Sequence, residues 1–142
     1  MALNTEAVLT ALAGWVSGLS GVQRVYEGVP EDLSHQVSAY VALGGQTLTD
    51  RPTGTLHREA NYLVVFGHAV AGAEQSAERQ IADLIDAFIA KWLTDRKINN
   101  TCETSKLDLT LADTPTYQVF ADQEFRVYPI VVQATQRATF TV

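Results

Sequence analysis

The sequence predicts a single α+β domain in which a mixed, largely antiparallel sheet carries two packed amphipathic helices. Its 142 residues suit one domain with one hydrophobic core. Two stretches repeat their apolar residues at the helical period of 3.6, and several others alternate with the period of two that is typical of strands. The order is helix, strands, helix, strands, without an internal repeat or a linker that would divide the chain.

The first helix is expected from Thr5 to Leu19. Asn4 or Thr5 can cap it, because a side-chain oxygen there accepts a hydrogen bond from a free N–H of the first turn. Gly18 and Gly21 supply the stop. We expect the helix to pack on the sheet, with a partner-facing helix as the alternative, through an apolar stripe of Val8, Leu12, Trp15, Val16 and Leu19.

Three strands are expected before the second helix. The first, from Val22 to Glu27, has no cleanly apolar face, and the second runs from Val37 to Gly44. The third, from His57 to His68, has apolar residues on both faces, which indicates a strand covered on both sides. The polar segment from Gly45 to Gly54 is either one arm of a hairpin or an exposed loop, and Gly44 with Gly45 is expected to form a turn.

The second helix is expected from Ala73 to Leu93 and forms one long unit with the strand before it. Glu74 and Glu78 lie in its early turns, and basic residues lie at or just past its end, as the helix macrodipole favours. Its apolar stripe consists of Ala77, Ile81, Leu84, Ile85, Phe88, Ile89 and Trp92.

The C-terminal third is expected to be rich in strands. One strand runs from Cys102 to Leu111, a loop follows from Ala112 to Gln123, and another strand runs from Glu124 to Ala134. Pro129 has no N–H, so this last strand is expected to be an edge strand or to be bulged there. The segment from Thr135 to Val142 continues the alternation and is expected to pair with this chain's sheet or with that of a neighbour.

Composition excludes several classes of protein. No apolar run reaches the roughly 18 residues needed to span a bilayer, and no secretory signal is expected. The single cysteine, Cys102, permits no intramolecular disulfide and is compatible with a reducing cytoplasm. The net charge of −6 and the isoelectric point near 4.9 argue against a general nucleic-acid-binding protein.

Residues that carry catalytic or metal chemistry are few. His35, His57 and His68 are spread over a loop and the two ends of one strand, and Cys102 has no companion at metal-ligand spacing. A nucleophilic pair of Cys102 with a histidine stays open, because such pairs meet in space, but a small buried cysteine is favoured. We therefore expect no catalytic residue, no metal and no cofactor.

Asp83 and Asp86 share one face of the second helix. Paired carboxylates serve acid–base catalysis only where burial separates their pKa values. These two lie off the apolar stripe, so a solvated helix face is the favoured interpretation. The chain also has no GxSxG, Walker or GxGxxG motif, and an enzyme is not expected.

The order and spacing of elements resemble those of the tail terminator (tail completion) proteins of long-tailed bacteriophages, also called minor tail proteins. The resemblance covers nearly the full length and rests on a pattern of elements without an invariant motif. The segments that carry it are, in order, GVQRVYEGVP, AYVALGG, the insertion with TDRPTG, HREANYLVVFGHAV, AERQIADLIDAFIAKWL and FRVYPIVVQ.

The resemblance implies a structural virion protein. Such proteins form a homohexameric ring on the head-proximal end of the tail tube, stop its polymerisation and present the surface for head joining. The implied partners are further copies of the chain, the tail tube protein and the head–tail connector proteins, assembled in the host cytoplasm. Genomic DNA would pass through the lumen without specific binding, and acidic residues lining that lumen would repel its phosphates.

The family has no catalytic residues to carry over, so the expected site is an interface with a neighbouring subunit or with the tube. The motive is the polar insertion between two good strands, and a plain solvent loop is the alternative. The resemblance also implies strand edges completed between subunits, for which the segment from Glu124 to Val142 could serve. The expected interface residues are Gln46, Thr47, Leu48, Thr49, Asp50, Arg51, Arg58, Tyr128 and Phe140.

Two other functions remain open. One is a head–tail connector of the head-closure or neck type, which would bind the portal side and not the tube. The other is a small-ligand-binding or enzymatic α+β domain, which needs a pocket with convergent polar groups. The histidines are its only candidate residues.

Overall fold

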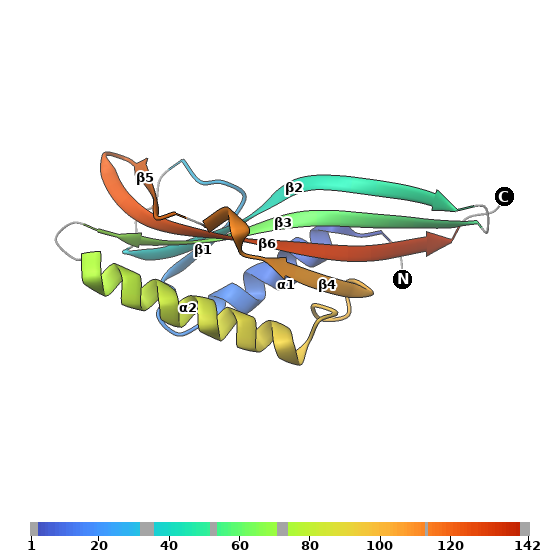
Figure 1. Cartoon of the computed structure of the whole chain (residues 1–142), viewed down its shortest axis with the longest axis horizontal. Helices are drawn as coiled ribbons and strands as arrows, with labels where there is room; N and C mark the ends of the chain where they lie inside the picture. The colour runs from blue at the N-terminus through green and yellow to red at the C-terminus, as the bar shows by residue number, and fades with distance from the viewer. Residues whose placement is uncertain (1–2, 32–35, 52–53, 71–73, 113, 140–142) are drawn as a thin grey trace.

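The computed structural model describes residues 3–31, 36–51, 54–70, 74–112 and 114–139 (Figure 1). Two helices lie on one face of a six-stranded sheet, so the predicted α+β class is confirmed. The elements are, in order, α1 (Thr5–Ser17), β1 (Arg24–Glu27), β2 (Val37–Arg51), β3 (Thr55–Ala69), α2 (Glu74–Thr94), β4 (Thr104–Asp108), the 3-10 turn η1 (Thr110–Ala112), β5 (Thr116–Phe120) and β6 (Gln123–Thr139).

The sheet is built around three long strands. Its order is β1-β2-β3-β6-β4, with β5 also pairing with β6, and only the β1–β2 pair is parallel. β3 pairs with β2 on one side and with β6 on the other over its whole length. β4 and β5 share the other side of β6, where β5 pairs with residues 123–127 and β4 with residues 131–135.

Helix α1 begins as the sequence indicates. The Asn4 side chain accepts a hydrogen bond of 3.0 Å from the backbone N–H of Ala7, which identifies Asn4 as the N-cap. The helix ends at Ser17, two residues before the expected end, with Gly18 as its C-cap, and the Gly18 N–H still bonds back to carbonyls of the last turn. The buried stripe confirms that this helix packs on the sheet.

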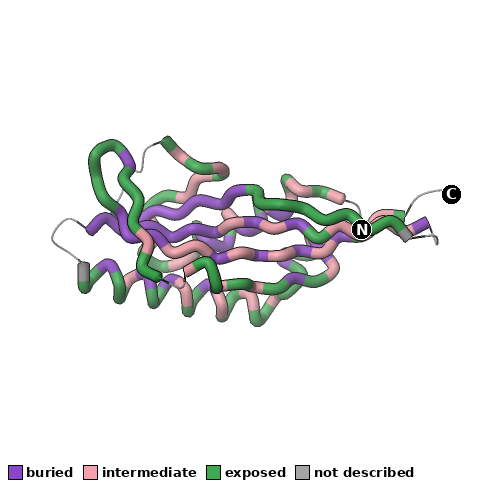
Figure 2. Tube along the Cα trace, turned by 45° about the horizontal axis from the view of Figure 1, so that its top comes forward, coloured by how far each residue is buried: buried purple, intermediate pink, exposed green. Residues whose placement is uncertain are grey.

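Both faces of β3 are covered, as its apolar pattern predicts. On the helix side, Phe88 contacts the rings of Trp15 and Phe66 edge to face, with centroids 6.2 and 6.1 Å apart. The other face carries a second, smaller core, in which Val65 packs with aromatic and apolar residues of β2 and of the β5–β6 hairpin. Figure 2 shows that the buried residues of the sheet are concentrated toward the end that carries β5.

The segment after Leu43 is a strand, and the expected turn at Gly44 and Gly45 is wrong. β2 continues to Arg51 and forms a long hairpin with β3, so the hairpin interpretation of this segment holds. Between Leu43 and Gln46 the register shifts, since β2 advances three residues while β3 advances two. This is a β-bulge. A Cβ at Gly44 would lie 3.0 Å from the Asn61 carbonyl oxygen, which explains the glycine there.

The expected loop from Ala112 to Gln123 is also wrong, because it contains β5. Only Phe120 of this strand is buried, so the strand lacks the alternation that a sequence pattern detects. Ala121 and Asp122 both have positive φ, at 48° and 63°, and form a tight turn into β6. The strand expected from Cys102 to Leu111 is likewise shorter, covering only β4.

Pro129 is accommodated in a different way from either expectation. β6 as a whole is not an edge strand, because it pairs with β3 on one side and with β4 and β5 on the other, and its register with β3 shows no bulge at Pro129, which pairs with Val65. On the other side, Pro129 falls in the gap between the stretches paired with β5 and β4. A missing N–H is tolerated there because no described strand requires it. The following residues pair with this chain's own β3 as far as Thr139.

We expect Phe88→Ala to lower the free energy of unfolding by about 3–5 kcal/mol, because it removes a fully buried ring from the helix-side core. Urea unfolding monitored by circular dichroism measures this. Leu93→Ala on the same helix is the control, since Leu93 is 58% exposed and should cost under about 1 kcal/mol. Equal losses for the two variants would contradict the packing described here.

Candidate assembly surface

The far ends of the three long strands form a projecting arm, defined here as residues 46–51, 55–60 and 134–139. The register holds the three segments side by side, from Gln46, Ala60 and Ala134 at the base to Thr55 and Thr139 near the tip. Figure 1 shows the arm extending well past the C-terminal end of α2. The polar insertion of the sequence therefore forms part of a regular sheet.

The two faces of the arm differ in character. Ala60 and Ala134 belong to the helix-side core, and the alternation of the strands places Leu48, Leu56 and Ala138 on that same face farther out. Leu48 is 61% exposed. The opposite face carries only polar side chains along the arm, namely Thr47, Thr49, Thr55, His57, Glu59, Thr135, Arg137 and Thr139.

The arm brings together most of the expected interface residues. Those from Gln46 to Asp50 are exposed on β2, Leu48 pairs with Arg58, and Arg51 ends the strand. Tyr128 lies apart from them: it is half-buried at the opposite end of β6, packs against the helix-side core, and has the Arg126 guanidinium 6.0 Å from its ring centroid. Phe140 and the Arg51 side chain lie outside the described part of the structure.

Gln136 ties the base of the arm to the helix layer. Its side chain is 1% exposed, its Oε1 accepts from Arg58 Nη2 and the Asn4 N–H, and its Nε2 donates to the carbonyls of Asn4 and Thr101. Arg58 therefore has a role within its own chain. The sequence signal for Gln136 was that it continues the alternating series of Val132 and Ala134, whose side chains are buried, but is itself polar.

The outer edge of β2 is the most distinctive feature of the arm. β1 pairs only with Ser38 to Val41, so the edge from residue 42 to residue 51 faces no described strand. Every residue from Leu43 to Asp50 is exposed, and none before Asp50 is charged. A long strand edge with free backbone groups and few charges is a template for pairing with another chain.

The histidines do not converge. His57 lies on the polar face of the arm, whereas His68 is buried near the other end of β3, with its Nδ1 2.7 Å from the Ala69 carbonyl. His35 lies outside the described residues. Within the described ranges, no group of three or more potential metal-binding side chains occurs. Asp83 and Asp86 are both exposed, as expected for a solvated helix face.

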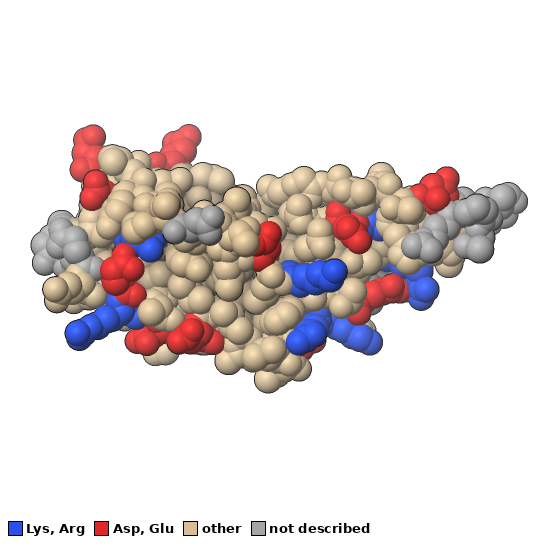
Figure 3. All heavy atoms as spheres, in the orientation of Figure 1, with Lys and Arg blue, Asp and Glu red and all other residues tan. Residues whose placement is uncertain are grey.

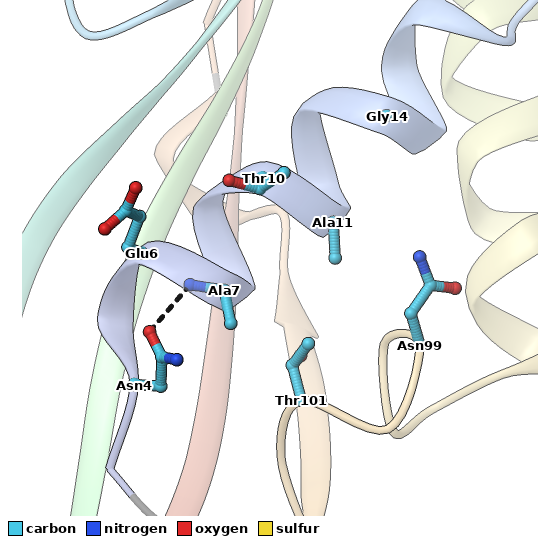
Figure 4. A pocket seen from close by; sticks show the side chains of 8 residues that line it. All are labelled: Asn4, Glu6, Ala7, Thr10, Ala11, Gly14, Asn99 and Thr101. Atoms are coloured by element: carbon cyan, nitrogen blue, oxygen red, sulfur yellow. Dashed lines mark hydrogen bonds between the residues drawn. The ribbon is translucent and has the colours of Figure 1, made fainter.

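A hollow of about 480 Å³ lies between the N-terminal half of α1 and the loop after α2 (Figure 4). Ala7 and Ala11 of the helix face Asn99 and Thr101 of the loop across it. A second hollow of about 570 Å³ lies on the opposite face of the sheet, beside Asn61 and η1. No histidine lines either hollow, so neither hollow contains the residues that were the candidates for a ligand-binding site.

Cys102 is a buried structural residue. It is 0% exposed, and its thiol lies 3.4 Å from the Lys97 carbonyl oxygen, which accepts its hydrogen bond. Burial raises the pKa of the Cys102 thiol to about 11. These contacts agree with the small, apolar role favoured for this cysteine.

Comparison with models of known protein families and with curated protein sequences finds no match. Among the described residues, no helix is long and apolar enough to cross a membrane. The geometry of the arm is thus the main structural guide to function.

We expect Gln136→Met to lower the free energy of unfolding by about 1–3 kcal/mol, because the side chain keeps its size but leaves the Arg58 guanidinium and the Asn4 and Thr101 groups without a partner. Gln133→Met, three residues earlier on the half-buried opposite face, should cost less than about 0.5 kcal/mol. Urea unfolding of both variants tests this, and a neutral Gln136→Met would contradict the proposed tie between arm and helix.

We expect a thiol-specific dye at about pH 8 to label the folded protein about two orders of magnitude more slowly than the protein unfolded in guanidinium, because the raised pKa leaves almost no thiolate and the sulfur is covered. The measurement is the rate of dye release. Rapid stoichiometric labelling of the folded chain would show that Cys102 is accessible and would contradict its structural role.

Proposed function

We propose that this chain is a structural protein of a phage tail, a tail terminator whose copies form a ring on the head-proximal end of the tail tube. The observation that carries the proposal is the arm, which presents an open strand edge outside the part of the sheet that the helices cover. Such an edge offers backbone N–H and C=O groups with which a strand of another chain can pair, so the arm suits assembly.

The buried polar side chains support a structural role. Gln136 joins two strands to the helix layer, and Ser105 joins the Trp92 indole to the Arg96 carbonyl. Arg126 pairs with Glu78 at 2.5 Å and so fixes the start of α2 to β6. Each of these groups is used to hold elements together, and none faces either hollow.

The proposed partners follow from the ring. Copies of the chain would contact one another, the tail tube protein would contact one face of the ring, and the head–tail connector would contact the other. The net charge of −6 per copy would keep the genome from adhering as it passes through the lumen. The protein would act in the virion after assembly in the host cytoplasm.

We expect purified protein mixed with assembled tail tubes to appear in negative-stain images as a cap on one tube end, with six-fold symmetry in end views. Capped tubes should also stop elongating when fresh tube protein is added. Caps absent from tubes but present on the portal vertex of the head would identify a connector. Binding to neither would overturn the structural proposal and return attention to the two hollows.

A further inference from the structure

The sheet has four outer edges in the described part of the chain, and two of them are guarded by charge. β1 carries Arg24 and Glu27 at its ends, and β4 carries Lys106 and Asp108. Charged residues on an edge strand discourage pairing with other chains. The other two edges are the open stretch of β2 and the outer edge of β5, which pairs only with β6 among the described strands.

β5 has the composition of an unguarded edge. Its sequence, TYQVF, contains no charge, and Tyr117 and Val119 are 47% and 68% exposed. The strand joins β6 through a tight turn, so its backbone is held extended and ready to pair. Exposed aromatic and β-branched side chains on a strand favour the addition of a further strand.

The two unguarded edges lie at opposite ends of the molecule. Figure 1 shows β5 at one end of the sheet and the arm at the other. A chain with an open edge at each end can satisfy both by repeating the same contact from copy to copy, and such a head-to-tail contact closes into a ring when the rotation allows it. A two-fold contact of β2 with β2 would leave β5 open in both copies.

The charges at the two ends differ. Residues 114–124, around β5, include the acidic Asp122 and Glu124 and no basic residue. The arm has three arginines and two acidic residues, and the exposed Lys106 lies on the neighbouring strand β4. Arg137 is paired with Glu103 at 2.9 Å and Arg58 is bound to Gln136, so the charge of the arm is mixed. Figure 3 shows acidic side chains around the β5 end, and acidic and basic ones side by side along the arm. The like charge of two β5 ends disfavours a contact between them, whereas the mixed charge of the arm does not oppose a contact with β5.

We propose that the open edge of β2 in one copy pairs with β5 of the next copy, so that β-strand addition joins the subunits head to tail. The inference rests on the proposed ring-forming function and names the two surfaces that build the ring. The paired stretch on β5 is five residues long and fits within the open part of β2.

Two variants that each add one cysteine to the native Cys102 test this contact. Thr49→Cys and Gln118→Cys place thiols on exposed positions of the two edges, while Cys102 is buried and does not interfere. A size tag on one variant distinguishes the products of oxidation. The mixture should give the mixed disulfide dimer, either variant alone should stay monomeric, and the double variant should give a ladder of linked subunits. The experiment is run with and without tail tubes.

A Thr49→Cys dimer formed without the second variant would show a two-fold contact and would overturn the inference, as would the absence of any cross-link in both conditions. If the wild-type protein caps tubes but the mixed disulfide dimer does not form, the proposed β2–β5 contact is wrong while the proposed tail function stands. The mixed dimer without capping would support the contact and contradict the role in the tail.

Charge placed on the edges gives an independent test. Leu48→Lys and Val119→Lys should each abolish self-association in sedimentation velocity while leaving the circular dichroism spectrum unchanged. Thr104→Lys, an exposed position on the guarded strand β4, is the matched control and should associate like the wild type. Loss of association in the control as well, or in none of the three variants, would contradict the proposed pairing.

Discussion

The structure depends on a mismatch in length between its layers. A helix rises about 1.5 Å per residue and a strand about 3.3 Å, so the 21 residues of α2 span about 30 Å whereas the 17 residues of β6 span about 55 Å. The helix layer therefore cannot cover the whole of the long strands. The part of the sheet under the helices carries the larger core, the β5–β6 hairpin covers the smaller core on the opposite face, and the far ends of the long strands form the arm.

The residue pattern of β3 follows that division. Its N-terminal half, from Thr55 to Asn61, is mostly polar and half-exposed, and its C-terminal half is buried almost throughout. Gln136 of β6 pairs with Arg58 of β3, close to the boundary between the half-exposed and the buried half. Its side chain forms hydrogen bonds with Arg58, with the Asn4 carbonyl before α1 and with the Thr101 carbonyl after α2. A buried polar contact thus joins the base of the arm to the helix layer, and the outer part of the arm extends beyond that layer.

The sequence predicts the parts of this fold that bury one regular stripe. The stripes of both helices and the two-sided burial of β3 could be identified from spacing, because each is set by local periodicity. The cap of α1 could be narrowed to Asn4 or Thr5, and the structure identifies Asn4. The bulge after Leu43 could not, since it depends on the close approach of Asn61 from the neighbouring strand. β5 could not be identified either, because its apolar residues Tyr117 and Val119 are exposed and do not form a buried face that alternates with polar residues.

The candidate site was predictable in part for the same reason. The segment from Gln46 to Arg51 stands out as a polar insertion, but only the structure shows that it is a strand with one open edge. Tyr128 was expected at the interface, whereas its half-buried ring packs on the helix-side core, a position fixed by the pairing of β6 with β3. The role of Gln136 depends on contacts more than 30 residues away in sequence.

Hydrogen exchange of backbone amides, measured with the protein free and bound to tail tubes, tests the central claim most directly. We predict that the amides of residues 42–51 and 116–120 that point to the open edges exchange rapidly in the free protein and become protected on assembly, whereas those that point to β3 or β6 are protected in both states. Amides on the guarded strand β4 should keep the same protection in both states. Unchanged exchange along residues 42–51 in the assembled state would contradict the claim that the arm is completed by another chain.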